Sequence, residues 1–365
     1  MFYYLFYQEL YPRTQLGALN VTQYSTFRTA AASLSALAIS LALGPWMIRK
    51  LREFQIGQII RHEGPTSHRA KAGTPTMGGL LILTGAIVPT LLWARLTSVY
   101  IWIAVLTTIA FGAIGFADDY LKITRRSHHG LLPRYKLSLQ LLAGAIVGVL
   151  LLVLTDQGLY NTRLVFPIFK RLIPDLGLFY LPFAAFVLAA ESNAVNLTDG
   201  LDGLAISIFA IAVAAYTALC FVTGNRVLAE YLLIPHFSLV GELTIFCGAL
   251  VGASLGFLWY NSYPAEIFMG DVGSLSLGAS LGIVAILIKQ ELLLPIVGGV
   301  FVLELLSVVL QVGYFKATGG KRLFRMSPLH HHFELIGWSE PKVIARFVIA
   351  AIIFALFSLA TLKLR

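Results

Sequence analysis

Long apolar stretches alternate with short polar ones along the whole 365-residue chain. A bilayer core about 30 Å thick needs roughly 20 apolar residues in a helix, within a range of about 17–25. Ten stretches approach that length and predict membrane-spanning helices: Thr29–Ile48, Met77–Ala94, Val99–Ala117, Leu137–Leu154, Leu176–Ala190, Gly203–Thr223, Leu243–Tyr260, Val272–Ile288, Leu292–Leu310 and Val343–Leu362. We therefore expect an all-α polytopic membrane protein, with residues 1–365 forming a single domain.

Composition agrees with this pattern. The chain is 58% hydrophobic and 12% charged, whereas about a quarter of the residues of a soluble protein are charged. These values exclude a disordered chain, a collagen-like chain and an ordinary water-soluble domain. The net charge of +9 would suggest nucleic acid in a soluble protein. In a membrane protein, the distribution of the basic residues among the loops matters more.

The basic residues predict an orientation. Sixteen Lys and Arg residues follow odd-numbered spans, and ten lie on the opposite side, termini included. By the positive-inside rule the loops after odd-numbered spans are cytoplasmic. Both termini should then lie outside the cytoplasm.

Carboxylates and histidines gather on the same expected cytoplasmic side. Each of the following comes after an odd-numbered span: Asp118, Asp119, Asp199, Asp202, Asp271, His330, His331 and His332. Clustered carboxylates repel one another and favour a divalent cation, and Mg²⁺ is typically held by one or two carboxylates together with substrate phosphates. Lys71, Lys122, Arg125 and Arg126 lie alongside and suit the neutralisation of phosphate oxygens. The combination predicts phosphoryl chemistry on a lipid phosphate.

Each motif also has a purely structural interpretation. Asp118 and Asp119 would cap the end of the third span, and Asp202 would be the N-cap of the sixth. Three consecutive histidines diverge by about 100° per residue on a helix, so phosphate binding or acid–base chemistry is favoured over zinc. The turn Gly73–Gly79 either brings backbone close to a phosphate or only begins a helix.

A secondary transporter is the alternative from another functional class. Transporters place polar residues near the midplane, on broken and repeated helices. Here the polar clusters lie at one face and no internal repeat is visible. These observations favour an enzyme.

Five strings together resemble the polyprenyl-phosphate N-acetylhexosamine-1-phosphate transferases. They are Gly73–Gly79, Phe116–Lys122, Asn193–Gly203, Asn261–Gly273 and Ser327–Glu334. The resemblance covers essentially the whole chain, and the string His330–Glu334 favours the muramoyl-pentapeptide branch over its amino-sugar relatives. One departure is Glu191-Ser192 before Asn193, where small or hydroxyl residues are expected.

The resemblance implies a reaction, a cofactor and a location. UDP-N-acetylmuramoyl-pentapeptide and undecaprenyl phosphate would give lipid I and UMP with Mg²⁺, in peptidoglycan synthesis at the bacterial inner membrane. It also suggests a homodimer in the lipid bilayer. The residues leave open whether a covalent aspartyl-phosphate forms or the lipid phosphate attacks directly.

The resemblance also implies roles for individual residues. Asp271 would be the principal Mg²⁺ ligand, and Asp118 would engage or deprotonate the lipid phosphate with Asp119 beside it near the metal. Lys122 would balance their charge. A uridine-diphosphate pocket would comprise Asn196, Asp199, Asp202, Asn261 and Phe268. Further substrate contacts would come from Lys71, Thr76, Gln311, His330 and His332, and His331 would join the catalytic group.

Overall fold

The computed structural model describes residues 1–54, 73–125, 130–167, 169, 172–232 and 234–362. Within these residues the fold is helical, and an isolated β-bridge joins Arg163 and Asp175. The helices longer than ten residues are α3 (Ser25–Glu53), α4 (Gly79–Trp93), α5 (Val99–Thr124), α6 (Pro133–Asp156), α7 (Tyr180–Thr198), α8 (Leu204–Gly224), α10 (Leu243–Asn261), α11 (Gly270–Leu287), α13 (Gly299–Ala317) and α15 (Glu340–Thr361).

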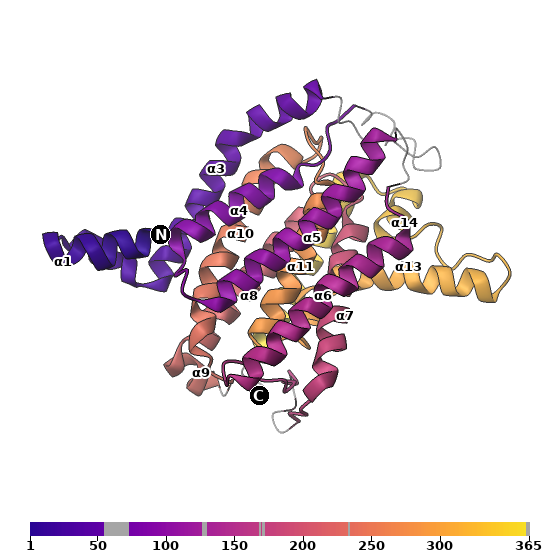
Figure 1. Ribbon diagram of the computed structural model, residues 1–365. Helices are drawn as coiled ribbons and strands as arrows, with labels where there is room; N and C mark the ends of the chain where they lie inside the picture. Colours follow the sequence, from indigo (N-terminus) through magenta and orange to yellow (C-terminus); the bar gives the residue numbers. More distant parts are fainter. Residues whose placement is uncertain (55–72, 126–129, 168, 170–171, 233, 363–365) are drawn as a thin grey trace.

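Shorter helices join or precede these ten. The N-terminal segment holds the π-helix η1 (Tyr3–Leu10), α1 (Tyr11–Thr14), α2 (Gly17–Asn20) and the 3₁₀ helix η2 (Val21–Gln23). The connections contain η4 (Gly177–Phe179), α9 (Arg226–Leu232), η5 (Ser238–Glu242), α12 (Leu294–Val297) and α14 (Leu329–Leu335). Figure 1 shows the N-terminal segment extending sideways from the bundle, and α13 projecting from its other side.

The all-α membrane architecture is confirmed at the level of its helices. In the described part of the chain, nine helices are long and apolar enough to cross a membrane, and α4 is a shorter apolar helix of 15 residues. Each of the ten overlaps one predicted span. That all ten cross the bilayer, and in which orientation, stays a prediction.

Several predicted boundaries were wrong. The fifth span was predicted to end at Ala190, but α7 continues to Thr198. The third span does not end before Asp118, because α5 continues to Thr124. The two aspartates are therefore inside a helix, and the capping interpretation fails. The ninth span was predicted from Leu292, but α12 ends at Val297 and α13 begins at Gly299.

The helix α11 forms the centre of the bundle. Every residue from Val272 to Leu287 is buried, and α11 packs against α4, α5, α7 and α8. Small residues such as Gly273, Ser276 and Gly278 allow this, because membrane helices without large side chains at their contacts approach closely.

Small residues also allow α3 to pack closely on α10. Gly248, Gly252 and Gly256 recur every fourth residue and share one face of α10. A Cβ atom built at Gly252 would lie 1.9 Å from the carbonyl oxygen of Ser33. Only glycine permits that backbone contact.

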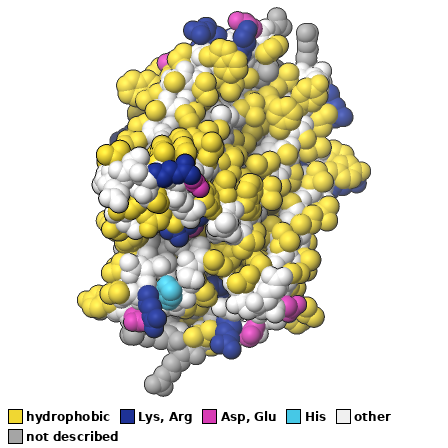
Figure 2. All heavy atoms as spheres, turned by 60° about the vertical axis from the view of Figure 1, so that its left-hand side comes forward, with side chains coloured by type: hydrophobic (Ala, Val, Ile, Leu, Met, Phe, Trp, Pro, Cys, Tyr) yellow, Lys and Arg dark blue, Asp and Glu magenta, His cyan; other side chains and the backbone are white. Residues whose placement is uncertain are grey.

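Outside this core the surface suits lipid. Figure 2 shows hydrophobic side chains over most of one face, with charged side chains toward its upper and lower ends and a smaller group at mid-height on the left. Exposed apolar residues on the long helices include Leu34, Leu106 and Ile353. This distribution is expected where the middle of the molecule contacts hydrocarbon.

Candidate active site

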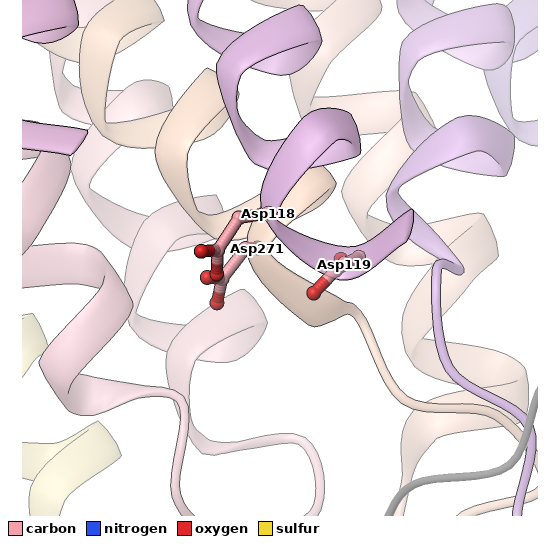
Figure 3. A group of neighbouring side chains, drawn as sticks. All are labelled: Asp118, Asp119 and Asp271. Carbon is pink, nitrogen blue, oxygen red and sulfur yellow. The ribbon is translucent and has the colours of Figure 1, made fainter. Parts of the chain in front are cut away.

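Three aspartates from two helices meet at one end of the bundle. Asp118 and Asp119 lie in the penultimate turn region of α5, and Asp271 lies in the first turn of α11. One carboxylate oxygen from each lies within 4.8 Å of the others. Figure 3 shows Asp118 and Asp271 side by side, with Asp119 to their right in this view. Asp118 and Asp119 are each 3% exposed, so their charges need compensation.

Glycines bring the two helices together at this point. A Cβ at Gly115 would lie 2.1 Å from the carbonyl oxygen of Asp271, so α5 and α11 touch through their backbones. Gly270 has a φ of 69° and its ideal Cβ would lie 2.6 Å from Asp119 Oδ2. Such a left-handed turn favours glycine, and it sets Asp271 at the start of α11.

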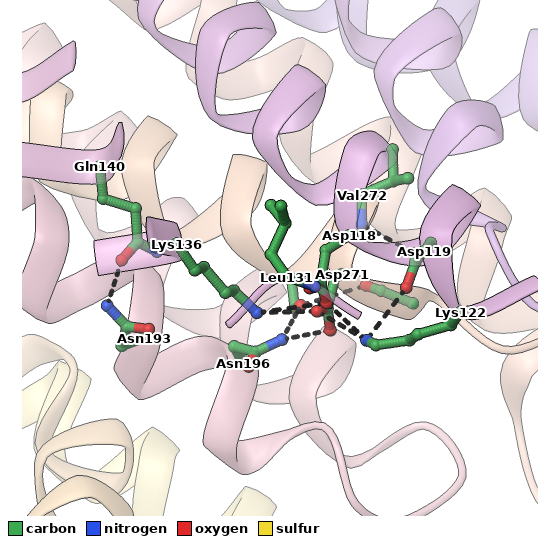
Figure 4. Close-up of polar contacts among 12 residues, drawn as sticks. Asp118, Asp119, Lys122, Leu131, Lys136, Gln140, Asn193, Asn196, Asp271 and Val272 are labelled. Carbon is green, nitrogen blue, oxygen red and sulfur yellow. Dashed lines mark hydrogen bonds and ion pairs between the residues drawn. The ribbon is translucent and has the colours of Figure 1, made fainter. Parts of the chain in front are cut away.

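Two lysines supply positive charge (Figure 4). Lys122 Nζ lies 2.6 Å from Asp118 Oδ2, 3.4 Å from Asp119 Oδ1 and 2.8 Å from Asp271 Oδ2. Lys136 Nζ, from α6, lies 2.7 Å from Asp271 Oδ2 and 3.7 Å from Asp118 Oδ2. With all five groups ionised, three carboxylates and two ammonium groups would leave one negative charge in excess.

Hydrogen bonds hold the remaining carboxylate oxygens. The backbone N–H of Leu131 donates to Asp118 Oδ1 at 2.6 Å, and that of Val272 donates to Asp119 Oδ2 at 3.2 Å. Asn196 Nδ2 donates to Asp271 Oδ1 at 2.8 Å and to Ser274 Oγ at 2.7 Å. Every carboxylate is therefore oriented by at least two partners.

The turn Gly73–Gly79 packs directly beside the aspartates. The N–H groups of Gly78 and Gly79 donate to the carbonyls of Phe268 and Met269 at 2.9 and 2.8 Å, and the N–H of Phe268 donates to Pro75 at 2.8 Å. Thr76 Oγ1 and Asp119 both border Gly270. The turn thus places predicted residues Thr76 and Phe268 next to the cluster.

The connection between α7 and α8 forms the adjoining wall. Burial, together with the negative charges of Asp271, Asp119 and Asp202, raises the pKa of Asp199 to about 8. Asp202 Oδ2 accepts the N–H of Ala265 at 3.0 Å, and the N-cap of α8 is Gly203. The N-cap assignment for Asp202 was therefore wrong.

Asn261 ties this wall together from within. Its side chain accepts the N–H of Gly203 at 3.1 Å and donates to the carbonyl of Ile267 at 2.8 Å. It is 3% exposed. In this arrangement Asn261 shapes the loop that carries Phe268.

The histidines lie on α14, outside the aspartate cluster. His330 is buried, and its ring borders Gly200 of the adjoining wall. His331 Nδ1 lies 2.8 Å from Glu334 Oε2, and His332 Nδ1 accepts the N–H of Arg325 at 3.1 Å. In the described part of the chain, the one group of metal-ligating side chains is that of the three aspartates.

Two polar residues of α13 hold the segment that leads into α14 and the start of that helix. Glu304 accepts the N–H groups of Leu329 and His330 at 2.7 and 3.2 Å. Gln311 Oε1 accepts those of Leu323 and Phe324 at 3.1 and 2.8 Å. The predicted substrate contact Gln311 therefore also fixes a loop. Lys71 lies outside the described residues.

Sequence reasoning missed Lys136 as a site residue, because it was counted only as a basic loop residue. A signal was present. Lys136 and Gln140 are four residues apart and share one face of α6, and polar residues of membrane helices normally face the protein interior. Gln140 donates to Ser192 Oγ at 3.0 Å and accepts from Asn193 at 2.8 Å. The departure Glu191-Ser192 thus sits at a contact between α6 and α7.

Comparisons with known proteins agree with this site. Residues 101–289 match glycosyl transferase family 4, and residues 71–83 match phospho-N-acetylmuramoyl-pentapeptide-transferase signature 1. Proteins named phospho-N-acetylmuramoyl-pentapeptide-transferase from Koribacter versatilis and Acidobacterium capsulatum are 56% and 57% identical, over 100% of both chains. One of the same name from Syntrophus aciditrophicus is 52% identical over 99% of this chain and 100% of its own.

Proposed function

The chain belongs to the phospho-N-acetylmuramoyl-pentapeptide-transferases within glycosyl transferase family 4, and on this premise we propose the reaction of its site. It transfers phospho-N-acetylmuramoyl-pentapeptide from the UDP-linked donor to undecaprenyl phosphate, giving lipid I and UMP. The observation that carries this is the buried cluster of Asp118, Asp119 and Asp271 with two lysines. Acidic and basic groups together at the end of membrane helices suit a lipid phosphate and a nucleotide diphosphate.

The residues fit a Mg²⁺ ion. Carboxylate oxygens are the hard ligands that Mg²⁺ prefers, and the cluster already attracts a cation, since Lys122 Nζ reaches all three aspartates. Asp271 would be the principal ligand, with Asp118 and Asp119 beside it. When bound, Mg²⁺ would neutralise charge on the diphosphate of the donor.

Protein side chains position both substrates. Lys122 and Lys136 lie where ammonium groups can bind phosphate oxygens as well as the aspartates. Asn196 orients Asp271, while Thr76 and Phe268, beside the same cluster, would contact the nucleotide. The wall containing Asp199 and Asp202, with Asn261 behind it, completes the uridine-diphosphate pocket. Gln311 and the three histidines of α14 support the sugar and peptide end.

Of the two routes for the transfer, we favour direct attack. An oxygen of undecaprenyl phosphate forms a bond to the β-phosphorus of the donor, and the bond from that phosphorus to the bridging oxygen breaks, so that oxygen leaves with UMP. Both oxygens of Asp118 are already engaged, by Leu131 N–H and Lys122. An aspartate held in this way suits orienting the lipid phosphate better than attacking the donor phosphorus itself.

The membrane setting is part of the proposal. Ten spans, with the aspartates at the cytoplasmic face and both termini periplasmic, would place the site where the nucleotide donor is made. We assign the protein to the bacterial inner membrane as a multi-pass protein, acting as a homodimer.

Release of UMP tests the function. Purified protein with UDP-N-acetylmuramoyl-pentapeptide, undecaprenyl phosphate and Mg²⁺ should release UMP and form lipid I in equal amounts, and chelation of Mg²⁺ should stop both. UDP-N-acetylglucosamine in place of the donor should release none. Turnover of UDP-N-acetylglucosamine, or passage of the donor into proteoliposomes without UMP, would refute the assignment.

A further inference from the structure

A polar cavity of about 300 Å³ lies at the other end of the bundle. It is lined by the start of α3, the connection before α5 and the helix η5. Ser98, on its wall, precedes Asp118 by twenty residues of α5, which corresponds to about 30 Å at 1.5 Å per residue. The cavity and the aspartate cluster are therefore separated by about one hydrocarbon thickness.

The charges that line this cavity do not balance. Glu242 is its one carboxylate, and it accepts Arg28 Nη1 and Nη2 at 2.7 Å each. Glu242 also accepts the backbone N–H of Arg95 at 2.8 Å, and Arg95 Nε lies 3.5 Å from it. Two guanidinium groups thus share one carboxylate, and the remaining lining residues are uncharged.

Hydrogen-bond donors are also in excess. Arg28 Nε, Arg95 Nε and Ser98 Oγ are buried without a hydrogen-bond partner among the described residues. Arg28 is 1% exposed and Ser98 is 6% exposed. Buried donors without acceptors are unfavourable, so this cavity suits a ligand that is negatively charged and offers mainly acceptor oxygens. Ser25, Thr97 and Ser238 add hydroxyl groups around the same space.

Aromatic residues place the cavity at the level of lipid headgroups. The ring of Tyr3 lies 5.0 Å from the guanidinium carbon of Arg28 and 4.2 Å from that of Arg95. Phe2 and Phe27 pack on Trp93 at the end of α4. Such aromatic belts mark the membrane–water interface. Tyr3 and Trp93 therefore put the cavity near the level of this interface.

We propose that the cavity between Arg28, Arg95 and Ser98 binds a phosphate group. Its source is either the headgroup of an anionic phospholipid or free inorganic phosphate. The site is separate from the transfer reaction at the opposite end of α5. Arg95, which is 40% exposed as a side chain, reaches the ligand from the open side, while buried Arg28 forms the floor.

The test is the thermal stability of the full chain in detergent, titrated separately with dihexanoyl phosphatidylglycerol, dihexanoyl phosphatidylcholine and inorganic phosphate. Phosphatidylglycerol should raise the Tm with saturation and phosphatidylcholine should do so weakly, because the choline cation opposes the net positive cavity. A saturable rise with phosphatidylglycerol alone assigns a lipid headgroup, and an equal rise with inorganic phosphate assigns the free anion. No saturable rise with either overturns the proposal.

Variants connect the response to the cavity. Arg95→Gln should weaken the apparent affinity about tenfold, as expected for loss of a charge-assisted hydrogen bond, and Arg95→Lys should restore part of it. Ser98→Ala, which removes only the unpaired hydroxyl, gives a second measurement in a chain whose ion pairs are intact. The control is Arg226→Gln on α9, an exposed arginine outside the cavity. Equal responses in Arg95→Gln, Ser98→Ala and the control contradict the assignment.

Discussion

At the aspartate cluster, the three carboxylates and two ammonium groups are one another's counterions, so each one depends on the others. Asp271 accepts from Lys122, Lys136 and Asn196, and these come from three different helices. Removing its charge therefore leaves two ammonium groups with only Asp118 and Asp119 as counterions. Loss of the Asp271 charge would therefore affect the bound phosphates as well as the two remaining aspartates.

Replacing Asp271 by asparagine should lower UMP release by at least about 10²-fold, the scale of losing one preorganised electrostatic group in a buried site. The side chain keeps its size, so the fold should be retained. The measurement is the initial rate across a Mg²⁺ titration. Asp156→Asn, at the exposed end of α6, is the matched control. A rate within threefold of the unaltered protein at saturating Mg²⁺ would remove Asp271 from the metal site.

Site residues that belong to a characteristic sequence motif were easier to predict than those whose role depends only on their place in the fold. Asp118, Asp119 and Asp271 stood out because carboxylates are rare in this chain. Lys136 did not, since its role depends on which way α6 faces, and one lysine among many follows the positive-inside rule equally well. His331 was expected in the catalytic group, yet its ring pairs with Glu334 on α14. Its catalytic role stays a prediction.

At the scale of elements, backbone contacts at glycines decide where the site residues lie. The contact of Gly115 with the carbonyl of Asp271 joins the two helices that carry all three aspartates. The spans themselves follow from hydropathy, so they were predictable. Their ends were not: α5 continues through Asp118 and Asp119 because lysines and backbone N–H groups compensate those charges.

Gly115→Ala should separate α5 from α11, because the new Cβ would lie 2.1 Å from a backbone oxygen that no side-chain movement can relieve. Overpacking of this kind costs about 1–3 kcal/mol, and the displaced Asp271 should lower the transfer rate too. Thermal unfolding and UMP release measure the two effects. Gly313→Ala, with nothing within 4 Å of its ideal Cβ, should keep or slightly raise stability. If both variants melt alike, the contact does not constrain the helices.

At the scale of the whole molecule, the direction of each helix decides at which end of the bundle its polar residues lie. At the aspartate end α4, α6 and α11 begin, and α5, α7 and α10 end. Glu340, at the start of α15, accepts the N–H of Asp202 at that same end. The start of α3 lies at the opposite end, where Arg28 contacts the last residue of α4. This alternation agrees with the parity on which the predicted orientation rests.

Cysteine labelling tests the orientation. Cys220 and Cys247 are buried, so a new exposed cysteine should dominate the reaction with a membrane-impermeant maleimide. Gln15→Cys, in the N-terminal segment, should label in intact spheroplasts. Lys321→Cys, in the loop after α13, should label only after lysis. The reverse pattern would invert the protein in the membrane.

The buried amide contact between α6 and α7 has a mechanical consequence. The apolar contacts of α6 with α5 and α7 are not directional, so on their own they would resist rotation about the helix axis less than hydrogen bonds do. Gln140, held by Ser192 and Asn193, restricts that rotation of α6. Lys136 lies one turn before Gln140. A rotation of α6 by about 100°, the angle between successive residues of a helix, would move the ammonium of Lys136 away from Asp271. The amide contacts therefore fix the rotation of α6 relative to α7, and the two helices should rotate, tilt or shift only as a pair.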